Sequence, residues 1–539
     1  MSDTKLVPRP AATLILLRDS AAGPEVLLLQ RTKSAVFLGG AYVFPGGSID
    51  ATDSSLIARL LGLDEAPVEP AAEYWIAAVR ECFEEAGVLI ACDVERRPIP
   101  AERAARLMDW RTRPFAELLA QEDLYIPGGE LAYFGHWITA PGRARRFDTR
   151  FFVAAAPQGQ EGSHDANETV HHIWITPREA LERSERGEIE LVFATQHTLK
   201  DLSRFDKVED AVRYVHSLEE IEVNRAWWAQ GKEGLKLFRR ADAPYHEIHW
   251  SDPEESGQTT YEIVAGEPKR LDRFVTRLTA PNPGMMTGPG TNTYIVGGEE
   301  ERAVIDPGPD IASHIEKILA FANIKWILCT HTHMDHSPAA AAVKAATGAK
   351  VLGRPAPPGQ DATFQPDHLL DNGQRIQIGK KGKGVALRAI HTPGHASNHL
   401  CYLLEETKML FTGDHVMQGS TVVINPPDGE MRAYLASLEK LLAEEIAIIA
   451  PGHGYLIGAP HKELRRLMAH RRAREDKVRR ALQQLGAASL EELLPLVYDD
   501  VPSRIHRMAA RSLTAHLDKL VVEGSVRTAG EKYRLVESR

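Results

Sequence analysis

Histidine and aspartate residues stand at the ends of short apolar segments in the C-terminal half of the sequence. The run KWILC leads into THTHMDH, and HTPGHAS, FTGDHV and APGHG follow; together they supply His331, His333, Asp335, His336, His395, Asp414 and His453. A strand turns alternate side chains to one face, so His331 and His333 can converge on one ion. Asp335 and His336, in the turn that follows, can reach a second. Zinc takes such imidazole and carboxylate ligands when one position stays open for water, so the pattern predicts a two-zinc hydrolytic centre.

A single histidine is more often a hydrogen-bonded core or surface residue than a metal ligand. Here four ligand-bearing segments follow one another along the chain, and those of His395, Asp414 and His453 each contain a glycine that lets the backbone turn sharply. The joint occurrence therefore favours the metal site.

A second group of charged residues occupies the segment VRECFEEAGVL in the N-terminal half. Glu81, Glu84 and Glu85 are spaced i, i+3 and i+4, so a helix places them on one face beside Arg80. Such carboxylates repel one another unless a hard cation lies among them, and Mg²⁺ or Mn²⁺ fits oxygen ligands and substrate phosphates. Gly87 is expected to end the helix. The alternative is an ordinary acidic surface helix.

The elements that must position these groups divide the 539 residues into about three domains and a linker. Residues 8–240 combine strand signals with a strong helix at 70–87, which predicts an α+β unit with a mixed sheet. Residues 241–265 are polar and contain prolines without helical periodicity, which indicates a linker. Strands alternate with helices in 266–460, and 461–539 is expected to form a small helical and basic domain.

The last of these segments shows a helix followed by a hairpin. Leu513, Leu517 and Leu520 or Val521 fall on one face of the predicted helix, and Gly524 ends it. The sequence SVRTA-GEK-YRLV then predicts two short strands joined by a turn.

Composition excludes several classes of protein. A formal net charge of −10 means that the chain as a whole does not bind polyanions, so any nucleic-acid contact needs a local basic patch. The four cysteines form no C-x-x-C pair, which excludes a thiolate zinc cluster and indicates reduced cysteines in a cytoplasmic protein. The apolar run TLILL is too short for a signal sequence, and no stretch approaches the ~18–20 apolar residues of a membrane span.

The seven predicted ligands resemble those of the metallo-β-lactamase superfamily, whose fold is an αββα sandwich. The resemblance implies that one zinc is held by His331, His333 and His395, that the other is held by Asp335, His336 and His453, and that Asp414 bridges them. It also implies that the two cations activate a shared water and clamp the oxygens of the bond being cut, with Asp335 as proton acceptor.

Two further segments are similar to the lactamase-β-like endoribonuclease group, which ends in a winged helix: NPGMMTGPGTNTYIVG before the metal motif, and the tail after APGHG. This similarity implies cleavage of single-stranded RNA. A winged helix also serves protein contacts, so a homodimer is a further expectation. The helix predicted at 462–480 carries nine Lys or Arg against three acids, a stripe that can track phosphates; the alternative is a solvated linking helix.

Small esters, thioesters and lactones stay open as substrates of the zinc centre. Only a short strand and a loop are expected between Asp414 and His453, which leaves no room for the large insert of RNA-processing relatives.

The segment FPGG at residues 44–47, followed by R-E-x-x-E-E-x-G at 80–87, resembles an interrupted Nudix box. The insertion reads DSSLIARLLGLDEAPVEPA, and its Asp53 falls where the first acid of the box would stand. The similarity covers roughly 8–240 and is to the coenzyme A diphosphatase type of Nudix protein, which implies an α/β/α sandwich. It also implies Mg²⁺-dependent hydrolysis of a nucleoside diphosphate linked to another group. Glu81 and Glu84 would act in catalysis, with Arg80, Gly47 and Gly87 at the binding site.

Three interpretations of the whole chain follow. In the first, the zinc centre cuts single-stranded RNA and the Nudix half cleaves a nucleotide. In the second, both halves act on acyl-CoA-type metabolites, one at the diphosphate and the other at a thioester or related ester. In the third, the Nudix half is a metabolite sensor that regulates the other half; the intact Arg80, Glu81, Glu84 and Glu85 weigh against this.

Overall fold

The computed structural model describes residues 6–33, 39–63, 69–380 and 382–536. It divides into two compact units, Met1–Trp228 and Ala229–Arg539. Residues 64–68, which belong to the predicted insertion, lie outside the described part of the chain. Over the described residues, no helix combines the length and the apolar character that crossing a lipid bilayer would need.

The N-terminal unit is built on an eight-stranded mixed sheet. Its strands run in the order β10-β7-β8-β1-β2-β3, with β4 paired to β1 and β9 paired to β2. They are β1 (Arg9–Ser20), β2 (Gly23–Arg31), β3 (Tyr42–Val43), β4 (Gly46–Ser48), β7 (Ala132–Ile138), β8 (Phe147–Ala155), β9 (Thr169–Ile175) and β10 (Val223–Arg225). β1 is parallel to β8 and antiparallel to β2.

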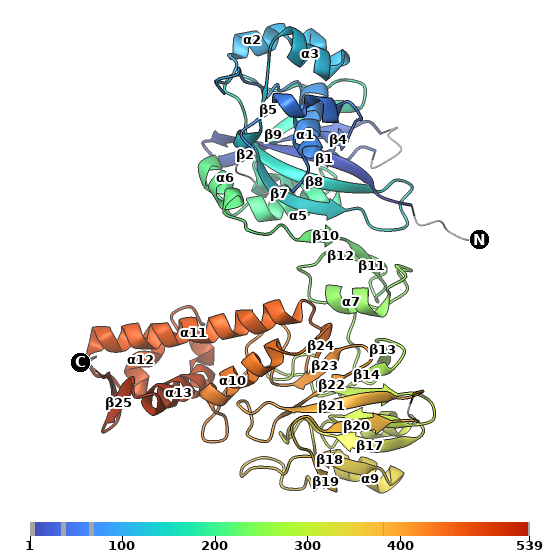
Figure 1. Cartoon of the computed structure of the whole chain (residues 1–539), viewed down its shortest axis with the longest axis vertical. Coiled ribbons are helices and arrows are strands. Elements are labelled where there is room, and N and C mark those ends of the chain that lie inside the picture. Colours follow the sequence, from blue (N-terminus) through green and yellow to red (C-terminus); the bar gives the residue numbers. More distant parts are fainter. Residues whose placement is uncertain (1–5, 34–38, 64–68, 381, 537–539) are drawn as a thin grey trace. The chain divides into compact units, whose positions relative to one another are not determined.

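Helices cover both faces of this sheet, and the apolar run in β1 is buried on both sides as a result. Leu14 and Leu16 face the core that includes α1 (Ala72–Ala86). Ile15 faces the opposite core with α5 (Phe193–Leu202) and α6 (Val208–His216) (Figure 1). A strand covered on both faces reads as a continuous apolar run rather than an alternation. The unit is the expected α/β/α sandwich.

The other elements before residue 240 are short, and the last of them, β12, already belongs to the second unit. They are η1 (Asp53–Arg59), β5 (Leu60–Leu61), α2 (Ala101–Arg106), η2 (Met108–Thr112), α3 (Phe115–Gln121), β6 (Ile126–Pro127), η3 (Gly128–Glu130), α4 (Pro177–Glu185), β11 (Trp227–Ala229) and β12 (Lys236–Phe238). α1 ends at Gly87 as expected; its φ of +64° is one that glycine adopts without strain.

Two sheets packed face to face form the centre of the C-terminal unit. The first contains β13 (Pro268–Arg270), β14 (Val275–Thr279), β15 (Asn292–Gly297), β16 (Arg302–Ile305), β17 (Ile324–Leu328), β18 (Lys350–Gly353) and β19 (His368–Leu369). The second contains β20 (Arg375–Ile378), β21 (Val385–His391), β22 (Leu400–Leu404), β23 (Met409–Gly413) and β24 (Ile448–Pro451). Ile305 and Leu328 of the first sheet share one core with Leu387 and Phe411 of the second.

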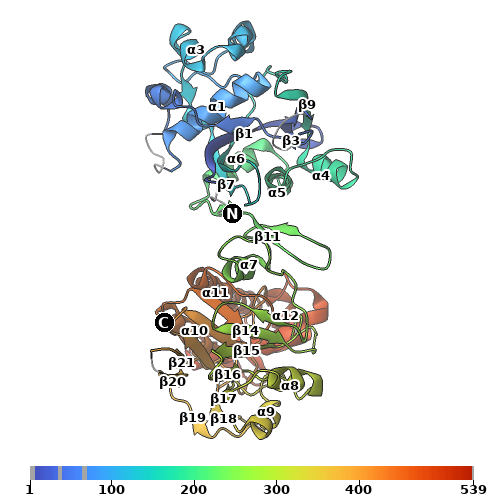
Figure 2. The same ribbon diagram turned by 90° about the vertical axis from the view of Figure 1, so that its right-hand side faces the viewer.

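Helices cover the outer face of each sheet. α8 (Ala312–Leu319) and α9 (Ala340–Thr347) pack on the first sheet. α10 (Met431–Leu442) and the start of α11 (Pro460–Leu485) pack on the second. Figures 1 and 2 show these layers from two directions. The arrangement is the expected αββα sandwich.

The interval between Asp414 and His453 differs from the sequence prediction. It was expected to hold only a short strand and a loop, but it contains α10. Met431, Tyr434 and Leu438 recur at helical spacing and are buried against the second sheet, which explains why a helix forms there.

The C-terminal segment forms a small helical core with a two-stranded wing. α11 contributes Val478 and Leu482 to this core, next to α12 (Leu490–Val497) and α13 (His506–Val522). Leu513, Leu517 and Leu520 of α13 are buried there, and Val521 packs against them, as predicted. The short helix η4 (Ser503–Ile505) precedes α13, Gly524 follows it, and β25 (Val526–Ala529) pairs antiparallel with β26 (Lys532–Leu535).

The polar segment 241–265, expected to be a linker, contains α7 (Tyr245–Ser251) (Figure 2). Its buried residues are Tyr245, Glu247 and Ile248. A helix with one turn of apolar contact and a buried carboxylate has no repeating apolar pattern, so periodicity could not reveal it.

Candidate functional site

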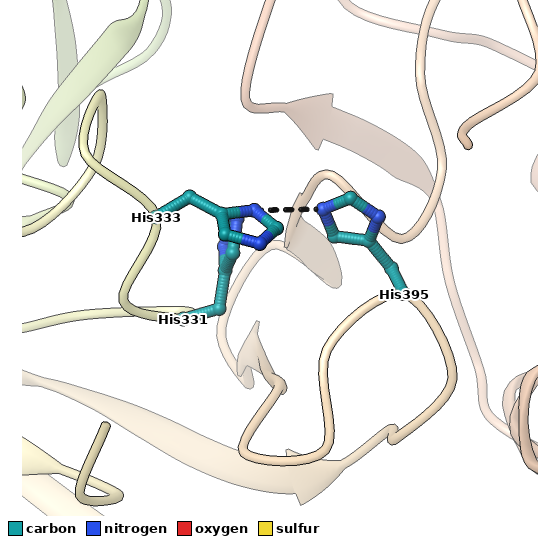
Figure 3. Close-up of side chains that lie close together, drawn as sticks. All are labelled: His331, His333 and His395. Atoms are coloured by element: carbon teal, nitrogen blue, oxygen red, sulfur yellow. Dashed lines mark hydrogen bonds between the residues drawn. The ribbon is translucent and has the colours of Figure 1, made fainter. Parts of the chain in front are cut away.

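The seven residues predicted as metal ligands lie together in loops that follow strands of the two-sheet sandwich. His331 to His336 follow β17, His395 lies between β21 and β22, Asp414 follows β23, and His453 follows β24. Their ligand atoms form three groups in which all atoms lie within 4.8 Å of one another: His331, His333 and His395; His331, His336 and Asp414; and Asp335, His336 and His453. Figure 3 shows the three rings of the first group meeting from two separate loops.

Several buried polar atoms of this cluster have no hydrogen-bond partner within the protein. They are His331 Nε2, His336 Nε2, His453 Nε2 and Asp414 Oδ1. His395 Nε2 and His333 Nδ1 lie only 3.0 Å apart and face each other (Figure 3). Buried polar atoms are almost always paired, so a group of unpaired nitrogen and oxygen atoms directed to one place fits a divalent cation.

The other nitrogen of each buried imidazole is held by the chain. His336 Nδ1 lies 2.9 Å from Asp306 Oδ2, His331 Nδ1 lies 3.0 Å from Thr330 Oγ1, and His453 Nδ1 lies 3.2 Å from the carbonyl oxygen of Gly290. A nitrogen that donates its proton outward leaves the second nitrogen as a lone-pair donor for a metal.

Asp306 is a supporting residue that sequence analysis did not single out. It is buried at the end of β16, and its carboxylate accepts hydrogen bonds from Thr330 N at 2.7 Å and Thr330 Oγ1 at 2.8 Å besides its contact with His336. It therefore orients two neighbouring ligands, His331 through Thr330 and His336 directly. The only signal in the sequence is the apolar run AVI, which ends directly in this aspartate.

His395 is held by Val423, whose neighbours are in turn held by the C-terminal segment of the chain. Its Nδ1 lies 2.9 Å from the carbonyl oxygen of Val423. The residues on either side of Val423 are fixed by Arg471 of α11, which donates to Val422 O, and by Ser512 of α13, whose hydroxyl accepts from Ile424 N at 3.4 Å.

The two sides of the cluster differ in electrostatics. Burial and the neighbouring His395 lower the pKa of His333 to about 4, and burial lowers the pKa of His331 well below its usual value. Burial also lowers the pKa of His453, but Asp414 and Asp335 outweigh it and raise the value to about 9. One side thus offers neutral imidazoles, whereas the other holds protons that a cation would displace.

Gly452 lets two ligands approach the backbone. A Cβ atom at this position would lie 2.7 Å from Asp414 Oδ1 and 2.8 Å from His336 Cε1. Only glycine leaves space for both ligands, which explains the glycine next to His453 in APGHG.

In the N-terminal unit, Arg80 lies at the centre of the predicted carboxylate cluster. Its Nη1 donates to Glu81 at 2.8 Å and to Glu84 at 3.1 Å. Its Nε and Nη2 donate to Asp53 at 2.8 Å and 3.1 Å, and Nη2 also donates to Ser48 O. Asp53, which is completely buried, thus anchors Arg80 from the start of the interrupted segment, and the extra residues follow it.

The three glutamates of α1 share one helical face but do not converge on one point. Glu81 and Glu84 turn to Arg80, whereas Glu85 accepts a hydrogen bond from Gly46 N at 3.0 Å. Among the described residues, the groups of ligand atoms within 4.8 Å of one another all lie in the C-terminal unit. Gly47 packs on this face: a Cβ there would lie 2.5 Å from the carboxyl carbon of Glu81.

Burial dominates the electrostatics of these glutamates. It raises the pKa of Glu81 to about 7 and that of Glu85 to about 8, and it raises the pKa of Glu84 as well. The Arg80 guanidinium opposes this rise at Glu81 and Glu84. Carboxyl groups that are hard to ionise gain from a nearby divalent cation, which stabilises the charged form.

Comparison with family models gives the same three domains in the expected order. Residues 62–204 match the NUDT19 Nudix domain, residues 286–453 match the Metallo-beta-lactamase superfamily, and residues 489–534 match the Beta-lactamase associated winged helix domain.

Relatives of known name match the C-terminal half. The Beta-lactamase-like protein 2 homolog of Drosophila melanogaster is 31% identical over 280 residues, 48% of this chain and 92% of that protein. The Atrochrysone carboxyl ACP thioesterase AgnL7 of Paecilomyces divaricatus is 31% identical over 277 residues, 48% of this chain and 83% of that protein. For the N-terminal half, the crystal structure of a NUDIX hydrolase from Alicyclobacillus acidocaldarius is 30% identical with a TM-score of 0.35, and the match covers 38% of this chain and 96% of that one.

The support that Asp306 gives to His336 and Thr330 predicts its effect on metal binding. Asp306→Asn should weaken binding of a divalent cation by about 10–100-fold, because the uncharged amide cannot hold Thr330 and His336 as the two carboxylate oxygens do. Competition with a chelator of known affinity measures this. Asp310→Asn changes an exposed acid nearby and should leave the affinity unchanged. Equal affinities for Asp306→Asn and the unmodified protein would contradict the role of Asp306.

The raised pKa values of Glu81 (about 7) and Glu85 (about 8) predict a pH dependence for magnesium binding. These groups are protonated near pH 6 and must lose their protons to bind Mg²⁺, so affinity should rise between pH 6 and pH 9. Calorimetry of the zinc-loaded chain, in buffers of different ionisation enthalpy, should detect proton release near pH 6 and almost none near pH 9. Glu85→Gln should reduce the number released, and pH-independent binding would refute the prediction.

Proposed function

The chain belongs to the metallo-beta-lactamase superfamily and is a hydrolase with a Nudix domain before the metal-binding sandwich and a winged-helix domain after it, and from this premise we propose that its C-terminal half hydrolyses acyl thioesters. The observation that supports a hydrolytic metal centre is the set of buried imidazole and carboxylate atoms left without protein partners. The proposed substrate class rests on the paired charges of α11 and on the name of one relative.

We assign the seven residues to two cations. His331, His333 and His395 hold one, and Asp335, His336 and His453 hold the other. Asp414 lies between them: its Oδ1 is 3.4 Å from His336 Nε2 and its Oδ2 is 3.9 Å from His395 Nε2. A donor set of nitrogen and oxygen atoms favours zinc. When bound, two such cations supply an activated water and stabilise negative charge on the substrate carbonyl oxygen.

Asp335 is the proposed proton acceptor. Its side chain is 27% exposed, compared with 13% for Asp414, so it is the more accessible carboxylate of the centre. Burial raises its pKa, but His336 and His453 outweigh this and keep the pKa below its usual value. An ionised carboxylate that faces solvent at the centre can take the proton of the attacking water.

The charges of α11 favour a thioester over RNA. The basic stripe at 462–480 was the physical support for phosphate tracking, but most of its nine cations have partners within the chain. Arg466, Arg472, Arg474, Lys477 and Arg479 pair with acids, and Arg471 is buried beneath Tyr434 and donates to Val422 O. Basic side chains that already pair with acids neutralise few phosphates, so they release few of the counterions bound to RNA and add little affinity. The relative AgnL7 is named as a thioesterase of an acyl carrier protein, which also favours a thioester.

For the N-terminal half we propose Mg²⁺- or Mn²⁺-dependent hydrolysis of a nucleoside diphosphate linked to another group. Glu81, Glu84 and Glu85 would hold the cation, with Glu81 and Glu84 nearest the reaction, while Arg80 positions both of them. Acyl-CoA carries both an acyl thioester and a nucleoside diphosphate, so one class of metabolite can serve both halves. The free, buried state of all four cysteines supports a reducing, cytoplasmic setting.

The two activities should separate by mutation. Zinc-loaded full-length protein should release free thiol from acyl-CoA or an acylated carrier protein, and His333→Ala should lower this rate at least about 100-fold, because a zinc ligand is lost. Glu84→Gln should leave thiol release unchanged. Conversely, Glu84→Gln should reduce the release of adenosine 3′,5′-bisphosphate from coenzyme A by about 10²–10⁴-fold, while His333→Ala should not.

Single-stranded RNA is the competing substrate in the same experiment. Cleavage of RNA without thiol release, abolished by His333→Ala, would replace the thioesterase proposal with a nuclease. If Glu84→Gln leaves the release of the bisphosphate unchanged, the Nudix half has another role, such as sensing a metabolite.

A further inference from the structure

Glu247 of α7 is a fully buried carboxylate in the segment that precedes the two-sheet sandwich along the chain. It accepts hydrogen bonds from Lys269 Nζ at 2.7 Å and Arg277 Nη2 at 3.0 Å, and it also pairs with Arg277 Nη1. Burial raises the pKa of Glu247, but Arg277 and Lys269 outweigh it and hold the value below the usual range. The group is therefore an anion in the protein interior.

The same carboxylate reaches the loop that carries His453. Its Oε2 accepts a hydrogen bond from the backbone N–H of Leu456 at 3.2 Å. Arg277, which Glu247 orients, donates to the carbonyl oxygen of Gly454 at 3.4 Å. The chain immediately after His453 is thus held at two successive points by one ion pair.

The chain immediately before His453 is held by a different set of residues. The carbonyl oxygen of Pro451 accepts from the Tyr294 hydroxyl at 2.7 Å and from Asn292 Nδ2 at 3.1 Å. Asn292 N donates to Gly452 O at 2.7 Å. These anchors belong to β15 of the sandwich itself. Asn292 Nδ2 also donates to Gly454 O at 2.9 Å, after His453, so β15 and Arg277 share that carbonyl oxygen. The hydrogen bond to Leu456 N, by contrast, comes from Glu247 of α7.

Close packing confirms that α7 lies against this part of the chain. A Cβ atom at Gly458 would lie 2.1 Å from His246 Nδ1, so the residue next to Glu247 occupies the space that a side chain at 458 would need. Tyr455, two residues after His453, also donates its hydroxyl hydrogen to Tyr261 O at 2.8 Å. The segment 241–265 therefore contacts the loop at several points.

We infer that Glu247 is a positioning residue for His453, acting through Arg277 and the backbone of Gly454 and Leu456. The inference rests on the proposed function, because it requires His453 to bind a cation. It adds that the second metal site, formed by Asp335, His336 and His453, depends on a residue outside the sandwich. The first site, formed by His331, His333 and His395, has its own supports at Thr330 and Val423.

A purely structural ion pair makes a different prediction from a positioning residue. Loss of a structural pair would lower thermal stability and weaken both metal sites together. Loss of a positioning residue weakens one site selectively, because only the loop of His453 loses its anchor.

Cobalt titration of the chelator-treated full chain separates these cases, since Co²⁺ bound at the two sites gives distinct visible spectra. The unmodified protein should bind two cobalt ions. Glu247→Gln should bind the first as before and the second about tenfold more weakly, the lower end of the effect of outer residues on metal affinity. Glu267→Gln alters an exposed acid later in the same chain, just before β13, and should bind both ions normally.

Glu247→Gln leaves Lys269 and Arg277 without their anion and can therefore unfold the protein, so a second variant is needed. Glu247→Gln with Lys269→Met removes one cation together with the anion and should show the same selective loss of the second ion. Normal binding of both ions, or equal loss of both with a fall in melting temperature, would overturn the inference. Failure of the unmodified protein to bind cobalt would instead refute the proposed metal centre, and the inference with it.

Discussion

The ligand cluster of the C-terminal unit depends on how its histidines divide their two ring nitrogens between the chain and the centre of the cluster. At each buried ligand the chain supplies one partner and leaves the other nitrogen directed inward. Asp306 serves His336, Thr330 serves His331, and the carbonyl oxygens of Val423 and Gly290 serve His395 and His453. These outer partners lie in four different loops of the two-sheet sandwich, so the ligand cluster forms only when both sheets have assembled.

The sequence predicted the ligands better than their supports, and the reason is physical. Ligands on one short loop, such as His331 and His333, lie close in the sequence because they must lie close in space. Asp306 and Glu247 act from elements far along the chain, so nothing near them in the sequence marks their partners. The three-layer folds were predictable because strands such as β1 bury residues on both faces and read as continuous apolar runs. α10 was not predicted, although Met431, Tyr434 and Leu438 recur at helical spacing, because the polar, proline-containing segment NPPDGE before it is typical of a loop.

The charged helices α1 and α11 show that residue type alone does not tell whether a charge is available for binding. On α1, three acids at helical spacing predicted a cation site, and the structure adds that Arg80 and Asp53 already organise two of them. On α11, the basic residues predicted a phosphate surface, yet most pair with acids of α11 itself, of α10 and of the loop after α12, or lie buried. A charge in a sequence becomes a binding surface only if folding does not provide its counterion first.

α11 also has a mechanical consequence. Its 26 residues form one uninterrupted helix about 39 Å long, with Leu464 and Leu467 anchored in the sandwich core and Val478 and Leu482 in the small C-terminal core. Bending between these anchors would break successive backbone hydrogen bonds, so the helix is a stiff connection between the two cores. A displacement of the wing would therefore move Arg471, midway along the helix. Through Arg471 it would shift the backbone of Val422 and Val423, which holds His395.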